Sequence, residues 1–175
     1  SLTSLVNFFN QFDCAIYKAE KINTHGGSIR IYIKKGKKIK IDQSVKNLLR
    51  EEDRFGIKNY DTYKKFSNQI NKIKHNFKRN IKKLKSNNES IIGYGSPAKA
   101  TTALNFFGVS DEIDFIVEDN KLKHGKYLPG VKIPIKSVKE VKKKPKFALV
   151  LAWNFFEEIQ SKNKDLAEKF INIKD

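Results

Sequence analysis

Two spacings of apolar residues run along this chain, and together they predict a small β unit, a long helix and an α/β region. From residue 59 to residue 86 an apolar residue recurs every three or four positions, with lysine, asparagine and glutamine between. This spacing predicts a long amphipathic helix. Residues 14–22 and 28–33 alternate apolar and polar side chains on either side of a glycine turn, so they predict a strand pair. A short helix is expected before this pair, over residues 1–12, and another after it, starting at Ser44.

The alternation also predicts which side chains of the strand pair are buried. In the first strand it places Ile16 on the face opposite Ala19. In the second strand it places three isoleucines on one cleanly apolar face: Ile29, Ile31 and Ile33. Ser44 has a hydroxyl oxygen that can accept a backbone N–H, so we expect it to be the N-cap of the helix that follows.

From residue 91 onward, short apolar runs alternate with helical patterns. The runs start at Ile91, Ile113, Ile133 and Phe147, and the last of them is continuously apolar, as a strand buried on both faces should be. This alternation predicts an α/β fold, with a Rossmann-like, mostly parallel sheet and flanking helices. We expect the final helix to run from Glu157 to Phe170, with a last short strand directly after it.

The end of the first of these strands carries the strongest candidate chemistry. Residues 91–99 read Ile-Ile-Gly-Tyr-Gly-Ser-Pro-Ala-Lys, which predicts a strand, a glycine turn and the start of a helix. We expect Ser96 to be the N-cap and Pro97 the first helical residue. Glycines allow close approach to the backbone, and the free N–H groups of a helix start favour anions, so this turn is a candidate phosphate site. The candidate binding residues are Gly93, Tyr94, Gly95, Ser96, Pro97, Ala98 and Lys99.

Two further loops are expected at the same edge of the sheet, because ligands of parallel α/β sheets bind at the carboxyl ends of the strands. Glu118 and Asp119 follow the second apolar run, where dinucleotide-binding domains carry an acidic residue. Asn154 follows the last long run. The α/β region is too short for two complete nucleotide-binding halves, so a mononucleotide or a nucleoside diphosphate fits it better than a dinucleotide.

Composition narrows the possible functions further. The 36 lysine and arginine residues contribute to a net charge of +17, but only four of them are arginines. Arginine is preferred for bidentate recognition of phosphates and bases, and the lysines are spread through every segment, so nucleic-acid binding is disfavoured. The single cysteine, Cys14, excludes an internal disulfide and a cysteine-rich zinc site. No apolar run has the length of a membrane span, which favours a cytoplasmic protein that does not contact a membrane.

Several motifs, in order, carry a resemblance to one family. The first motif is the turn at residues 93–99. Four motifs follow it: Asp-Phe-Ile-Val at 114–117, Gly-Lys-Tyr-Leu-Pro-Gly at 125–130, Ile-Pro-Ile at 133–135 and Leu-Ala-Trp-Asn-Phe at 151–155. One motif lies upstream of it, His-Gly-Gly-Ser-Ile-Arg-Ile-Tyr at 25–32. In this order and at about this spacing, the chain resembles the C-terminal domain of the S-adenosylmethionine-dependent nucleotide-sugar C-methyltransferases. The resemblance covers nearly the whole chain.

The resemblance implies that the full-length protein has three domains with separate functions. Members of the family carry an N-terminal zinc-binding domain, a central domain that binds S-adenosylmethionine, and this C-terminal domain. It also implies that the catalytic Tyr, Glu and His cluster lies before Ser1, so the chain alone is expected to be inactive and to bind neither zinc nor S-adenosylmethionine. Residues 1–58 would link to the missing catalytic core. Residues 59–175 would form the long helix and the Rossmann-like domain.

For this chain the resemblance implies a substrate-positioning role. The ligand would be a nucleoside-diphosphate deoxysugar, with its diphosphate on the turn at residues 93–99. The nucleoside would lie near Asn154 or near the acidic residues Glu118 and Asp119.

The remaining expectations concern the three histidines and two alternative functions of the chain. His25, in a glycine turn, is the candidate catalytic residue, because an imidazole titrates near neutral pH; a turn histidine bonded to nearby backbone is an equal alternative. His75 and His124 are expected to be solvated, and three scattered histidines do not suggest a metal site. A basic nucleic-acid-binding module on residues 64–85 stays open, as does a small dinucleotide- or coenzyme-A-binding domain that uses the same glycine turn.

Overall fold

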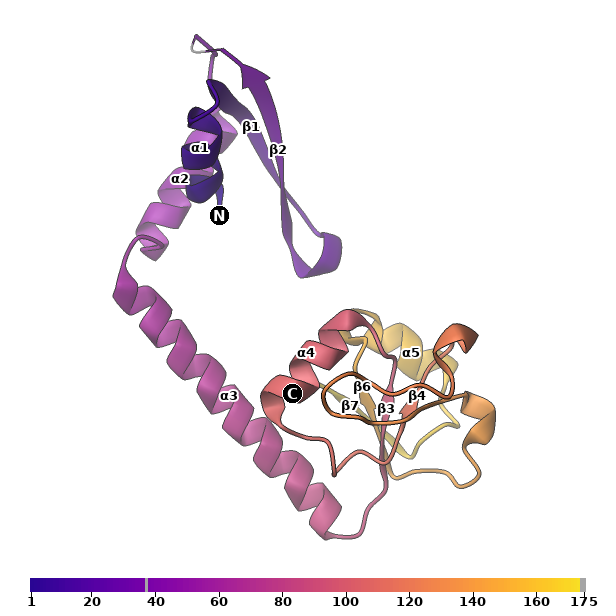
Figure 1. The fold of residues 1–175 in the computed structure, drawn as a ribbon. Helices are drawn as coiled ribbons and strands as arrows, with labels where there is room; N and C mark the ends of the chain where they lie inside the picture. The colour runs from indigo at the N-terminus through magenta and orange to yellow at the C-terminus, as the bar shows by residue number, and fades with distance from the viewer. Residues whose placement is uncertain (37, 174–175) are drawn as a thin grey trace. The chain divides into compact units, whose positions relative to one another are not determined.

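The computed structural model in Figure 1 describes residues 1–36 and 38–173. The chain forms two compact units, Ser1–Gln69 and Ile70–Asp175, and the long helix α3 (Tyr60–Ser86) runs from one into the other. In the described ranges no helix is long and apolar enough to cross a membrane. The division into residues 1–58 and 59–175 stays a prediction.

In the first unit two helices pack against an antiparallel strand pair. β1 (Cys14–Ile22) pairs with β2 (Ser28–Lys35) across a single 3-10 turn. α1 (Leu2–Asn10) and α2 (Gln43–Phe55) contribute the rest of a small core. Glu52 of α2 links the two helices, because its carboxylate accepts the first two amide hydrogens of α1 at 2.6 and 2.8 Å. These amides have no partner within their own helix.

A β-bulge makes the predicted faces of β1 wrong. The register against β2 shifts between Ile16 and Lys18, which leaves Tyr17 as the extra residue. An extra residue reverses the alternation of side chains, so Ile16 and Ala19 lie in the same core, 3% and 5% exposed. The sequence placed them on opposite faces.

The isoleucine face of β2 is only partly covered. Ile31 packs against the core, but Ile29 and Ile33 are 37% and 40% exposed. The nine residues of α1 span about 14 Å and the thirteen residues of α2 about 20 Å, whereas the eight residues of β2 span about 26 Å. Neither helix therefore matches the full length of the strand.

Asp42, not Ser44, is the N-cap of α2, so this prediction was also wrong. The Asp42 carboxylate accepts the Ser44 N–H at 2.8 Å. The Ser44 hydroxyl instead accepts the N–H of Ala19 at 3.2 Å and ties the helix to β1.

The second unit is built on a five-stranded, all-parallel sheet, which confirms the predicted fold class. The strand order is β5-β4-β3-β6-β7. In chain order these are the third, second, first, fourth and fifth strands, as in the Rossmann arrangement. The elements are β3 (Ile91–Tyr94), α4 (Ala98–Phe107), β4 (Ile116–Val117), β5 (Ile135–Lys136), β6 (Phe147–Val150), α5 (Phe156–Lys162) and β7 (Lys169–Asn172).

Helices cover both faces of this sheet (Figure 1). The second half of α3 and α4 pack on one face, where the rings of Phe77 and Phe107 lie 4.3 Å apart between centroids. The other face packs against α5 and the segment that follows it. Successive residues of β6 point to alternate faces, so all of them are buried. This explains the continuously apolar run in the sequence.

The last helix is shorter than predicted, and the last strand begins earlier. α5 ends at Lys162 rather than Phe170. The Asn163 side chain donates a hydrogen bond to the Ile159 carbonyl oxygen at 2.9 Å, and asparagine favours helix ends over helix interiors for this reason. Phe170 belongs to β7, which pairs with β6 in parallel.

Candidate functional site

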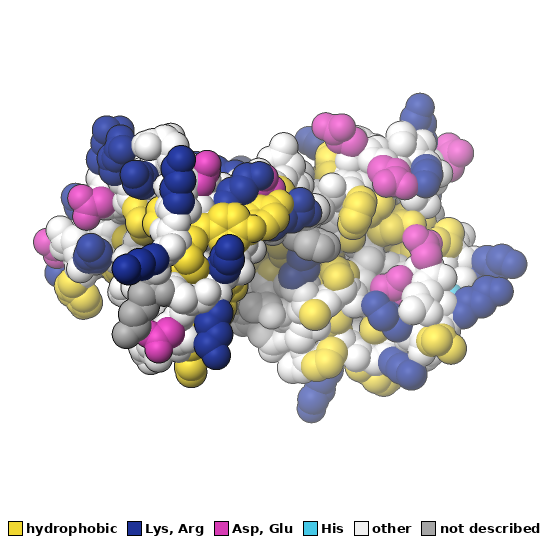
Figure 2. Space-filling view, turned by 90° about the horizontal axis from the view of Figure 1, so that it is seen from above, with side chains coloured by type: hydrophobic (Ala, Val, Ile, Leu, Met, Phe, Trp, Pro, Cys, Tyr) yellow, Lys and Arg dark blue, Asp and Glu magenta, His cyan; other side chains and the backbone are white. Residues whose placement is uncertain are grey.

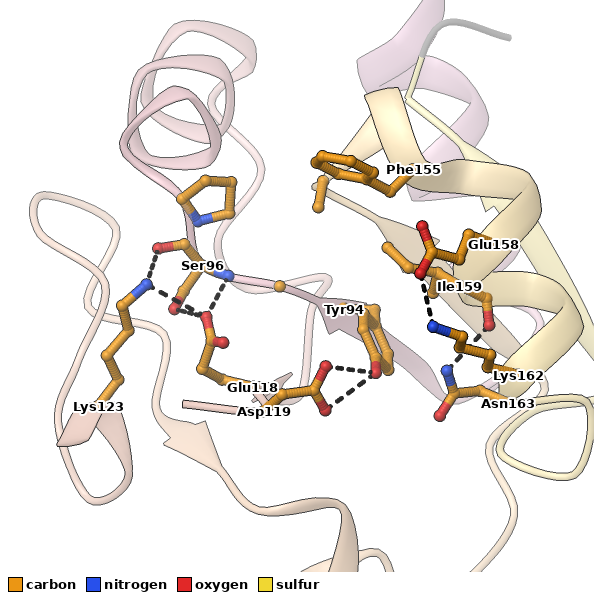
Figure 3. A pocket seen from close by; sticks show the side chains of 13 residues that line it. Tyr94, Ser96, Glu118, Asp119, Lys123, Phe155, Glu158, Ile159, Lys162 and Asn163 are labelled. Carbon is orange, nitrogen blue, oxygen red and sulfur yellow. Dashed lines mark hydrogen bonds and ion pairs between the residues drawn. The ribbon is translucent and has the colours of Figure 1, made fainter. Parts of the chain in front are cut away.

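A cavity lies at the carboxyl edge of the sheet, where the chain order reverses between β3 and β6. In open α/β sheets this reversal point is where ligands bind. The cavity has a volume of about 410 Å³. Its walls come from the loops after β3, β4 and β6 and from one side of α5 (Figure 3).

Gly93 lies inside β3 and Gly95 lies in the turn after it, and packing requires glycine at both positions. A Cβ atom on Gly93 would lie 2.9 Å from the Ile116 side chain and 3.0 Å from that of Leu151. Gly95 has a positive φ of 84°, and a Cβ atom there would lie 3.1 Å from the Cβ of Ala152. The end of β3 and the turn after it therefore need glycine at these two positions in order to fit between the neighbouring strands.

The start of α4 differs from the prediction. Pro97 is the N-cap, the helix begins at Ala98, and no side chain caps it. The Ser96 hydroxyl, predicted to be the cap, instead donates to Glu118 Oε2 at 2.5 Å. The Ser96 N–H donates to the same oxygen at 2.9 Å.

Glu118 is the most heavily bonded side chain of the cavity. Besides both Ser96 groups, it accepts the N–H of Asn120 at 3.0 Å and forms an ion pair of 3.3 Å with Lys123. Burial alone would raise the pKa of Glu118. The hydrogen bonds from Ser96, Asn120 and Lys123 favour the charged form more strongly and lower the pKa to about 2. Glu118 is therefore a carboxylate at neutral pH.

Asp119 lies beside Tyr94 on the floor of the cavity (Figure 3). The Tyr94 hydroxyl is 3.0 Å from both carboxylate oxygens of Asp119. Burial, and then this hydrogen bond, raise the pKa of Tyr94 to about 12. Tyr94 is therefore a neutral hydrogen-bond donor that orients the Asp119 carboxylate.

The opposite wall is formed by α5 and the turn before it. Phe155 is 58% exposed although it is a large aromatic residue, and its ring faces the cavity (Figure 3). Glu158 and Lys162 form an ion pair of 2.6 Å along α5. This wall therefore combines an aromatic surface with a paired charge.

The three loops predicted to converge do meet here, but not every candidate residue lines the cavity. Those that do are Tyr94, Gly95, Ser96, Pro97, Glu118 and Asp119. Gly93 lies in the core. The ammonium of Lys99 stacks 4.4 Å from the centre of the Trp153 ring. Asn154 lines a neighbouring hollow together with Trp153.

Other residues of the cavity were not named as binding candidates, although Ala152 and Phe155 belong to the motif at residues 151–155 that was expected at this edge. They are Lys123, Ala152, Phe155, Glu158, Ile159, Lys162 and Asn163. Three of them, Glu158, Ile159 and Lys162, lie on α5, and Asn163 directly follows it. These four could be found only by knowing which side of that helix faces the sheet. Lys123 was within an expected loop, and its position depends on the short 3-10 helix at Lys121–Lys123.

The histidines give a mixed outcome. The backbone of His25 lies in the 3-10 turn of the first unit, but its side chain lies outside the described part of the structure, so its catalytic role stays a prediction. His124 is not simply solvated, because its Nε2 lies 2.6 Å from the carbonyl oxygen of Glu118. The ring nitrogen can donate a hydrogen bond there. Among residues 1–36 and 38–173, no group of three or more His, Cys, Asp or Glu side chains could hold a metal ion.

Fold and cavity together define a Rossmann-like domain with a site at the strand reversal point. Comparison with known proteins makes the class more specific. Residues 23–172 match the family model described as the C-methyltransferase C-terminal domain, so the chain belongs to this family. It is 29% identical over 171 residues to the C-methyltransferase NovU of Streptomyces niveus. That match covers 96% of the chain but only 41% of the relative.

Proposed function

We propose that this chain is the substrate-binding domain of an S-adenosylmethionine-dependent C-methyltransferase, and that its cavity binds a nucleoside-diphosphate deoxysugar. The observation that carries the proposal is the cavity at the reversal point between β3 and β6, lined by hydrogen-bonding groups and an exposed phenylalanine. Its volume of about 410 Å³ is at the lower end for small-molecule sites. It therefore holds one part of a nucleotide sugar.

In the full-length enzyme the proposed reaction begins when a base removes a proton from the carbon next to a sugar carbonyl. The electron pair left on that carbon would form the new carbon–carbon bond to the methyl group, and the methyl–sulfur bond of the donor would break with its electron pair staying on sulfur. S-adenosylmethionine supplies the methyl group when it is bound. The residues of this chain bind and orient the sugar nucleotide, and correct positioning can supply a large part of a rate enhancement.

A nuclear magnetic resonance titration of the chain tests the binding role. We expect uridine diphosphate glucose or thymidine diphosphate glucose to shift the amide signals of residues 94–96 and 118–119 in a saturable way, at both low and high salt. Phe155→Ala should weaken binding several-fold, because it removes a surface on which a ring can stack. Phe55→Ala is the matched control, since Phe55 is 70% exposed in the first unit. The absence of any shift at these amides would overturn the proposal.

The same titration with a DNA duplex addresses the nucleic-acid alternative. On the face drawn in Figure 2, lysine and arginine side chains are scattered among apolar and acidic ones. A nucleic-acid interface would show shifts along residues 64–85 that disappear at high salt. We expect no saturable shifts there.

A further inference from the structure

We propose that Asp119 recognises a vicinal diol of the ligand, and that the phosphates bind outside the cavity because Glu118 already occupies the anion position of the glycine turn. The inference rests on the proposed function and assigns a part of the ligand to the same site. The diol belongs either to the ribose of the nucleotide or to the attached sugar.

The first step is the occupancy of the turn. In glycine-turn sites that bind phosphate, backbone N–H groups at the helix start donate to the anion. Here the N–H and hydroxyl of Ser96 both donate to Glu118, at 2.9 and 2.5 Å, and Ser96 is 7% exposed. The carboxylate of Glu118 thus takes the two hydrogen bonds that Ser96 in the turn could otherwise donate to a phosphate. The helix start beyond it, Ala98 and Lys99, is not part of the cavity lining.

The second step is the charge balance. Among the described residues that line the cavity there are three carboxylates, Glu118, Asp119 and Glu158, against two lysines. Each lysine is already paired, Lys123 with Glu118 and Lys162 with Glu158. A diphosphate placed here would add negative charge to a site with an excess of one carboxylate, and like charges at this range repel. A neutral part of the ligand avoids this cost.

The third step is the hydrogen-bonding capacity of Asp119. A carboxylate offers about four acceptor positions, and the Tyr94 hydroxyl is the partner seen for Asp119 in the described residues. Both oxygens of Asp119 therefore retain acceptor capacity, and the residue is exposed at the cavity. Two adjacent hydroxyl groups on a ring can donate one hydrogen bond to each oxygen. Phe155, on the facing wall, offers a surface for the ring or base.

Calorimetric titrations with matched ligands test the inference. Uridine diphosphate and 2′-deoxyuridine diphosphate differ only in the ribose diol. Uridine diphosphate glucose and its 3-deoxyglucose analogue differ in the sugar diols. We expect one of these two pairs to differ in affinity by about tenfold or more in the wild-type chain, as for lost hydrogen bonds to a charged group. The pair that differs identifies which ring supplies the diol.

The variant Asp119→Asn makes the test specific. The asparagine can still accept from Tyr94, so the fold should be retained, and thermal melting checks this. In this variant the affinity difference within the sensitive pair should fall to less than about threefold, because the discriminating carboxylate is gone. Glu168→Gln is the matched control. It removes one carboxylate that is paired with Lys146 at 2.7 Å, away from the cavity, and it should leave the discrimination unchanged.

The outcomes separate this inference from the proposed function. If uridine diphosphate glucose binds at the cavity but neither ligand pair differs, or Asp119→Asn discriminates as the wild type does, the inference is overturned and the proposed function stands. Inorganic pyrophosphate that competes with uridine diphosphate and shifts the Ser96 amide would also overturn it, because the turn would then hold the phosphates. If no nucleotide ligand shifts the cavity amides, the proposed function itself fails.

Discussion

Replacing Glu118 by glutamine is expected to destabilise the protein at neutral pH and much less in acid. The pKa of this carboxyl is about 2 in the folded chain, against an ordinary value of 4.5. A difference of this size corresponds to about 3 kcal/mol of stabilisation at neutral pH. Glutamine retains one acceptor oxygen for Ser96, so we expect a net loss of about 2 kcal/mol for Glu118→Gln. The side chain is 12% exposed, so solvent screens these interactions only weakly.

The direction of the pKa shift of Glu118 determines how this stabilisation depends on pH. Because the folded-state pKa lies below the unfolded value, the contribution is complete above about pH 5 and is lost progressively as the pH falls towards 2. More than half of it should be gone at pH 3. Urea unfolding followed by circular dichroism at pH 7 and pH 3 measures the free energy of unfolding of both proteins.

The control for this prediction is Glu168→Gln, which breaks an exposed ion pair with Lys146. Exposed pairs contribute little, so the urea midpoint of this variant should stay close to that of the wild type. A loss for Glu118→Gln that is equally large at pH 3 and pH 7, or no loss at pH 7, would refute the assignment of Glu118 as the charged group that holds the turn.

Three further changes should have measurable effects. Gly95→Ala should cost about 1–3 kcal/mol in urea unfolding, because the residue has a positive φ and its Cβ would lie 3.1 Å from that of Ala152; no loss would contradict the described turn. Phe77→Ala should cost about 3–5 kcal/mol, since the ring is 7% exposed and stacks on Phe107; a loss below 1 kcal/mol would mean that α3 does not pack there. Hydrogen bonds lower the pKa of Glu52 despite its partial burial, so protection of the α1 amides from hydrogen exchange should decrease as the pH falls through that pKa, and Glu52→Gln should abolish this dependence. If the protection of the α1 amides depends on pH equally in the wild type and in Glu52→Gln, the proposed link through Glu52 is refuted.

The sequence predicts those features that depend on local spacing. The period of three to four residues in α3 and the continuously apolar run of β6 both led to the observed elements, because burial imposes its period directly on the residues. The order of these elements was enough to predict a parallel sheet, since short crossovers between parallel strands allow few topologies. Convergence of three loops at one edge then follows from the topology.

The errors occur where a side chain has a choice between partners. Ser44 and Ser96 both have the hydroxyl that an N-cap needs, and both use it on a group distant in sequence, the Ala19 amide and the Glu118 carboxylate. The bulge at Tyr17 likewise depends on how β1 pairs with β2. The spacing of apolar and polar residues along the sequence does not predict contacts between residues that are distant in the chain. The residues of α5 at the cavity, including Lys162, were missed for the same reason.

The glycine turn shows why a motif and its chemistry must be argued separately. In a phosphate-binding fingerprint one of the glycines is explained by the close approach of the ligand to the backbone. Here Gly93 is required by the side chains of the neighbouring strands, and Gly95 by a positive φ beside Ala152. The fold alone therefore accounts for both glycines, and their presence does not indicate a phosphate. The group that distinguishes this turn is Glu118, which fills it, and the residue left to meet a ligand is the next one in the chain, Asp119.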